Sequence, residues 1–122
     1  MAIGDDRFVP DKINGAASGP PRQVVAAAGA ITIAQGVVLI TAGSGIAVTI
    51  GDPPTQMDGA ILHVISNTAQ AHTLNNSAGS GFNIGGAASD IGTFGGAIGD
   101  GVILIAYAGN WLVSANTNVT LA

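Results

Sequence analysis

The stretch ITIAQGVVLITAGSGIAVTI, residues 31–50, shows most clearly how this chain folds. It contains three short apolar runs, and the run Ile46–Ile50 has a period of two. Gly36 separates the first two runs, and Gly43-Ser44-Gly45 separates the second from the third. Short apolar runs between glycine turns are typical of β-strands. The stretch therefore predicts three strands and no helix.

The same pattern continues toward the C-terminus, beyond a break at Asp52-Pro53-Pro54. The sequence predicts strands at 31–33, 37–40, 46–50, 61–66, 70–74, 102–107, 111–114 and 119–121. About eight short strands separated by Gly, Asn and Pro are typical of a single all-β domain. We expect a small β-sandwich, jelly-roll-like fold or barrel over residues 23–122.

The first 22 residues differ from the rest of the chain. They mix charges, three prolines and a Gly-Ala-Ser patch without a sustained period. Pro20-Pro21 favours extended backbone. Residues 1–22 are therefore predicted to form an extended N-terminal arm that contacts another subunit, or alternatively folds back on its own domain. The arm residues expected to bind a partner are Ile3, Arg7, Phe8, Val9, Pro10, Lys12, Ile13 and Arg22.

Charge is scarce and unevenly placed. Charged residues make up 8% of the chain, against roughly 25% in ordinary globular proteins. All three cations lie within the first 22 residues, so the remaining hundred offer none for nucleic-acid phosphates. The uncharged segment 23–51 is long enough to span a bilayer, but glycines and threonines interrupt it, so no membrane span is expected. The start lacks an apolar signal segment, which predicts a cytoplasmic site of synthesis.

The glycine-rich segment 95–101 invites comparison with phosphate-binding loops. Its spacing is G-G-x-x-G-x-G, and an apolar β-branched run follows where a helix is required. The only lysine is Lys12, so the Lys of a P-loop is missing as well. We therefore expect these glycines to serve backbone geometry and close packing. No cofactor is predicted.

Few residues are suited to catalysis. There is no cysteine, and His63 and His72 are the only histidines. Both are expected to pack structurally, with a ring of one of them around a trimer axis as the metal- or anion-binding alternative. The aspartates after residue 22 each lie in a Gly- or Pro-containing stretch, where an aspartate caps its own turn; they are Asp52, Asp58, Asp90 and Asp100. No catalytic or metal-binding residue is predicted, and an enzyme would need both histidines and an aspartate in one cleft.

The five aromatic residues divide into two groups. Phe82 and Phe94 lie in loop-like sequence, where an exposed ring could bind a ligand. Tyr107 and Trp111 flank the reversal Ala108-Gly109-Asn110, and both are expected to pack across that hairpin. Outward strand positions are expected to carry Thr, Ser, Asn, Gln and Ala. A surface with so little charge is expected to be covered by copies of the chain or by another protein. The alternative is a monomer whose Ser and Thr side chains contact water.

Four motifs carry a resemblance to a protein family. They are "DGA" at 58–60, "TAQAHT" at 68–73, "TFGGAIGD" at 93–100 and "AYAGNW" at 106–111. In this order, over roughly residues 57–121, the chain resembles small structural proteins of tailed bacteriophages. The resemblance implies a capsid decoration, or cement, protein: a homotrimer on the outer surface of the virion that binds the major capsid protein with N-terminal arms and has no catalytic residues.

The sequence thus leads to a ranked expectation. The first is a non-enzymatic virion protein that binds and stabilises the capsid shell and associates with itself. The alternative is a phage fibre or spike domain that binds a host-surface glycan or protein through Phe82, Phe94 or the 75–96 loop.

Overall fold

The structure is a computed structural model that describes residues 21–122. Within that range the chain forms ten strands and two short 3-10 helices, so the prediction of an all-β domain is confirmed. The strands are β1 (Arg22–Val25), β2 (Gly29–Ala30), β3 (Gly36–Ile40), β4 (Ala47–Thr49), β5 (Ile61–Ser66), β6 (Thr73–Asn75), β7 (Ile91–Phe94), β8 (Gly101–Tyr107), β9 (Asn110–Thr117) and β10 (Val119–Leu121). The helices are η1 (Thr55–Met57) and η2 (Gly86–Ala88).

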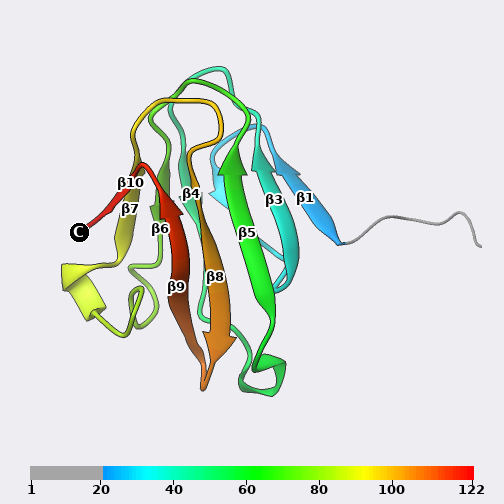
Figure 1. Cartoon of the computed structure of the whole chain (residues 1–122), viewed down its shortest axis with the longest axis vertical. Coiled ribbons are helices and arrows are strands. Elements are labelled where there is room, and N and C mark those ends of the chain that lie inside the picture. Colours follow the sequence, from blue (N-terminus) through cyan, green and yellow to red (C-terminus); the bar gives the residue numbers. More distant parts are fainter. Residues whose placement is uncertain (1–20) are drawn as a thin grey trace, which may run out of the picture.

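The strands form two open sheets packed face to face, so the chain adopts a sandwich and not a closed barrel (Figure 1). The first sheet has the order β1-β3-β5-β8-β9, and the second has the order β10-β7-β6-β4-β2. Ten strands are present where about eight were expected. Two of them were not expected: β1, whose first residue Arg22 was assigned to the arm, and β7, which lies in a segment assigned to a loop.

The first six strands pass alternately from one sheet to the other. Each strand therefore lies beside the strand two places later, and those neighbours are parallel: β1 with β3, β3 with β5, β2 with β4, and β4 with β6. This half of the domain is a coil of three turns, and it departs from the antiparallel order of a jelly roll. The last four strands are antiparallel to their neighbours and complete both sheets.

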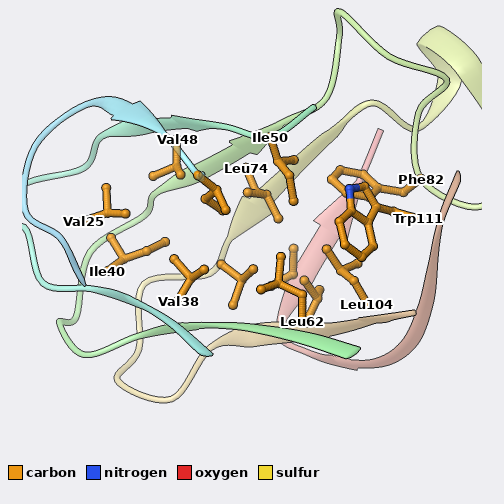
Figure 2. Packing of buried hydrophobic residues seen from close by; sticks show 14 of the residues in the cluster. Val25, Val38, Ile40, Val48, Ile50, Leu62, Leu74, Phe82, Leu104 and Trp111 are labelled. Atoms are coloured by element: carbon orange, nitrogen blue, oxygen red, sulfur yellow. The ribbon is translucent and has the colours of Figure 1, made fainter. Parts of the chain in front are cut away.

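The hydrophobic core fills the space between the sheets (Figure 2). Alternate residues of the longer strands point inward, as the burial of Leu62 and Val64 on β5 shows. Their partners in register on β8 are Leu104 and Val102, which are buried as well. The second sheet contributes Val48 and Leu74. Side chains from both sheets thus interdigitate along the full coil.

The β8–β9 hairpin turns where the sequence predicted a reversal. Ala108 and Gly109 are the two connecting residues, with φ angles of 52° and 78°. Positive φ at both positions is typical of the turn type that matches the twist of a two-residue hairpin. The expectation that both flanking aromatic residues pack across the hairpin is wrong for Tyr107, which is 62% exposed. Trp111 points inward and is buried.

Candidate functional site

The structure separates the residues that the sequence singled out. Seven of the eight arm residues, Ile3 to Ile13, lie outside the described residues. The eighth, Arg22, belongs to β1, where it pairs with Val37 of β3. The described sandwich therefore includes Arg22, which the sequence placed in the arm.

Both candidate ligand-binding aromatic residues are buried. Phe82 and Phe94 are each 1% exposed. Phe82 lies beside Trp111 through an isolated bridge, and Phe94 is the last residue of β7. The prediction that these rings are exposed in a loop is therefore wrong. The glycine-rich sequence around them is typical of a loop, but both residues belong to the core.

The two histidines do not form a pair, because one faces outward from the first sheet and the other is buried in the core. His63 lies on β5 between the inward-facing Leu62 and Val64, so its side chain faces outward. His72 precedes β6 and is fully buried. Its ring meets Phe94 edge-on, with the ring centroids 6.2 Å apart.

Hydrogen bonds fix the protonation state of His72. Its Nδ1 accepts a hydrogen bond from the amide of Ile46 at 3.2 Å. Its Nε2 lies 3.1 Å from Oγ1 of Thr68, and that hydroxyl donates its own hydrogen to the carbonyl of Ala42 at 2.8 Å. Because a hydroxyl has one hydrogen, Nε2 of His72 must be the donor to Thr68. The ring is therefore neutral, and burial lowers its pKa below the usual 6.5.

We expect acid to destabilise the domain through His72. Below pH 6.5, the unfolded chain binds a proton that the folded ring resists until its lowered pKa is reached, so stability is full above pH 6.5 and falls as the pH drops below it. The slope is at most about 1.4 kcal/mol per pH unit. Urea unfolding over this range, in the His63→Gln background that leaves one histidine, measures it. Removing the remaining imidazole by His72→Gln should flatten the profile, and an unchanged slope would contradict the assignment.

The aspartates hold distant loops together. The carboxylate of Asp52 accepts from the amide of Ser80 at 3.1 Å, and that of Asp58 accepts from the amide of Ala108 at 2.8 Å. The expectation that each caps its own turn is wrong for these two, because their partners lie 28 and 50 residues away.

Asp100 is the buried member of this set. It is 3% exposed, and Oδ2 accepts from the amides of Ala97 at 2.8 Å and Gly96 at 2.9 Å. The side-chain amide of Asn118 donates to both carboxylate oxygens of Asp100. The backbone hydrogen bond from Ala97, helped by Asn118 and Gly96, lowers the pKa of Asp100 although burial opposes it. Asp100 thus fastens the 95–100 loop to the β9–β10 turn, which is a structural role.

Two surface hollows in the described part of the chain each contain a single carboxylate. The first, of about 190 Å³, is lined by segments 31–34 and 50–54 and by Trp111. The second, of about 330 Å³, is lined by Gln35 and segment 56–60. Neither lining contains a histidine or a second acid, and no group of three metal-binding side chains occurs among residues 21–122. No helix there is long and apolar enough to cross a membrane.

The outer face of the first sheet is the most unusual surface of the domain. Residues in register across the strands point the same way, and these outward rows are mostly apolar, with Arg22, Asn110 and Thr117 on the two edge strands. We call this surface the apolar face; it consists of Val24, Val37, Leu39, Ile61, His63, Ile65, Ile103, Ile105, Tyr107 and Leu112. Val24, Ile61 and Tyr107 are more than half exposed.

The outer face of the second sheet has the opposite character. Threonine is the commonest residue in its outward rows. Thr73, Thr93 and Thr120 are in register, and Thr49 lies in the adjacent row. The expectation of Thr, Ser, Asn, Gln and Ala at outward positions holds for this sheet and is wrong for the first. The outer face of the second sheet can therefore hydrogen-bond to water, whereas that of the first sheet exposes aliphatic side chains to water.

Amide side chains hydrogen-bond to backbone groups on three of the sheet edges. Gln23 donates to the carbonyl of Ala30 and accepts from the amide of Thr32, which satisfies the outer edge of β2. Asn83 accepts from the amide of Val113 on β9. Asn116 forms two hydrogen bonds with the backbone of Val119 on β10.

These contacts cover three of the four edge strands. An edge whose backbone groups are paired offers no template for an added strand. Of the two outer faces, the apolar face is the one that gains most from being covered by a protein partner.

The apolar face could have been found in the sequence. The runs 37–40 and 102–105 are apolar at successive positions, and 61–65 is interrupted only by His63. A continuous apolar run is typical of a strand buried on both sides. The runs thus indicated a second buried surface that the sandwich itself does not supply.

The chain matches no known protein family model, curated protein or solved structure.

Proposed function

We propose that this protein is a structural subunit of a bacteriophage virion, a decoration protein that binds the outer surface of the major capsid shell and stabilises it. The observation that carries the proposal is the apolar face, a broad aliphatic surface on a rigid sheet, in a domain whose hollows gather no catalytic set. Such a surface stabilises a protein assembly by leaving water and needs no chemistry of its own.

The resemblance to phage structural proteins supports the same proposal. Its motifs coincide with structural parts of the described domain: "DGA" leads into β5, "TFGGAIGD" covers the end of β7 and the loop held by Asp100, and "AYAGNW" is the β8–β9 hairpin. These segments lead into β5 and β8 or form the hairpin between β8 and β9, and all three strands belong to the first sheet. The partners proposed are the major capsid protein and further copies of this chain in a homotrimer.

The fibre or spike alternative loses its main support. It required exposed Phe82 or Phe94 to stack on a host ligand, and both rings lie in the core. Large apolar side chains do protrude from loops, namely Ile84 at 65% and Ile98 at 70% exposure. They are single aliphatic residues, which lack the flat aromatic surface that sugars stack against.

Deletion of residues 1–20 tests the role of the arm. The deletion stops before Pro21 because the carbonyl of Pro21 accepts from the amide of Val37 and so belongs to the sandwich. We expect the shortened protein to fold but to bind capsids roughly tenfold or more weakly, since an arm adds local concentration at a second contact. Co-sedimentation with capsids that lack the protein measures binding, and circular dichroism checks the fold.

The full chain and a Thr120→Lys variant, altered on the threonine-rich sheet, serve as controls and should bind equally. If the full chain fails to bind capsids, the proposed function is wrong. If the shortened chain binds as well as the full one, the arm has no role in binding.

A further inference from the structure

We propose that the apolar face joins copies of this chain to one another, and that His63 at its centre makes this association sensitive to acid. The inference rests on the proposed function and deepens it, because it assigns the apolar face of the assembly subunit to a contact between two copies of the chain. It follows from the extent of the face, the placement of charges and the position of His63.

The face is large enough for a specific interface. Five strands lie side by side in the first sheet, and strands are spaced about 4.8 Å apart, so the sheet is roughly 24 Å wide. The seven residues of β8 span roughly 23 Å at about 3.3 Å per residue. One copy thus presents roughly 500 Å², and a pair buries roughly 1,000 Å², the lower limit for a stable biological interface.

The placement of charge favours a second copy as the occupant. Among the described residues, Arg22 is the one charged residue in the outward rows, and it lies on the edge strand β1. The four aspartates of the described chain all lie in loops: Asp52, Asp58, Asp90 and Asp100. Two copies meeting through this face therefore bring aliphatic rows together without opposing like charges. Interfaces between identical subunits have this apolar, charge-poor centre.

His63 occupies the middle of the face in both directions. Strand β5 is the third of five, and His63 is the second of its three outward residues, between Ile61 and Ile65. Its neighbours in register are Val37 on β3 and Ile103 on β8. When two copies meet through the same patch about a twofold axis, the axis passes through the centre of that patch. The His63 side chains of the two copies therefore lie in the middle of the interface.

Acid would place a charge at that point in every copy. Histidine is the side chain whose charge changes between about pH 5 and pH 8. The residues packed beside His63 on both flanking strands are aliphatic, and the titratable groups of the face, Arg22 and Tyr107, lie at its periphery. A charge buried among aliphatic side chains without a partner is costly, and like charges from several copies repel one another. Association should therefore weaken as the pH falls.

The test is the oligomeric state of the purified full chain. Sedimentation equilibrium at about pH 7.5 should show an oligomer that dissociates roughly tenfold or more easily at about pH 5. Ile61→Lys places a cation on the face at a position that is already 55% exposed, so the monomer keeps its fold. This variant should be monomeric at about pH 7.5, whereas Thr120→Lys on the other sheet should associate like the wild type. His63→Gln, which keeps a polar group but cannot be protonated, should remain associated at both pH values.

The outcomes separate this inference from the proposed function. A monomeric wild-type protein, or an Ile61→Lys protein as oligomeric as the wild type, would overturn the assignment of the face. A wild-type oligomer as stable at about pH 5 as at about pH 7.5 would overturn the role of His63. A monomer that binds capsids, and loses that binding in Ile61→Lys, would assign the face to the capsid protein while the proposed function stands. Circular dichroism at both pH values distinguishes dissociation from the unfolding expected through His72.

Discussion

Replacing Trp111 by alanine is expected to lower the free energy of unfolding by about 4 kcal/mol, in the range measured for large aromatic residues removed from cores. Trp111 is 1% exposed and is the largest buried side chain of the domain. It lies beside Phe82 at one end of the core (Figure 2). Its Nε1 donates to the carbonyl of Gly51 at 2.8 Å, which ties β9 to the loop after β4. Alanine leaves a cavity and an unpaired carbonyl at once.

The effect should be visible as a loss of thermal stability. A domain of about 100 residues loses roughly 4–8 °C of melting temperature per kcal/mol, so the variant should melt about 15–30 °C below the wild type. Trp111→Phe retains most of the volume and removes the hydrogen bond, so it should cost less than half as much. Tyr107→Ala, on the same hairpin but 62% exposed, is the matched control and should cost less than about 1 kcal/mol. A Trp111→Ala protein as stable as that control would contradict the packing described here.

Strands with continuous apolar runs were predicted to within a residue or two. The runs expected at 37–40, 61–66 and 102–107 became β3, β5 and β8, because β-branched and aliphatic residues dominate them. Two strands were missed for a shared reason: β1 follows the Pro20-Pro21 pair, and β7 contains Gly92 within a glycine-rich stretch. Local composition pointed to loops, and pairing with neighbouring strands decided otherwise.

The expected strand at 31–33 is not formed. Strand β2 ends at Ala30, and the amide of Thr32 is taken by the side chain of Gln23, nine residues away. The parallel coil was equally out of reach of the sequence. Which short strand pairs with which depends on the path of the chain between two sheets, and no turn residue specifies a return to the first sheet.

The candidate surface lies at residues that the sequence did not single out. Scarce charge led to the expectation of a domain whose surface is covered by a partner, which stays a prediction. The sequence placed the binding residues in the arm or at Phe82 and Phe94, whereas the structure reveals an outward aliphatic surface in the middle of the longest apolar runs. Residues of such a run face both sides of a sheet, and only the arrangement of the second sheet shows which side remains uncovered.

Gly101→Ala is expected to lower the free energy of unfolding by about 3 kcal/mol, the upper end of the usual cost of overpacking. Gly101 begins β8 and pairs with Ile65 of β5. A Cβ at this position would overlap the carbonyl oxygen of Val64 and lie 3.0 Å from the Cα of Ile65. Both atoms belong to the backbone of a central strand, so no side-chain rotation relieves the overlap. The strands must separate, and the hydrogen bond from the amide of Ser66 to the carbonyl of Asp100, 2.8 Å long, is strained with them.

The comparison with Gly43→Ala distinguishes this close packing from the general flexibility of glycine. A Cβ at Gly43 meets nothing within 4 Å, and its φ lies outside the left-handed region. Alanine there should be neutral or stabilise the domain by about 0.4–1 kcal/mol, because it restricts the unfolded chain without a clash. Urea unfolding of both variants measures the difference. Gly101 is the last residue of the segment Gly95–Gly101, which resembles a phosphate-binding loop only in its glycine content. If Gly101→Ala unfolded like Gly43→Ala, close approach of β5 and β8 could not be the reason for glycine at its end.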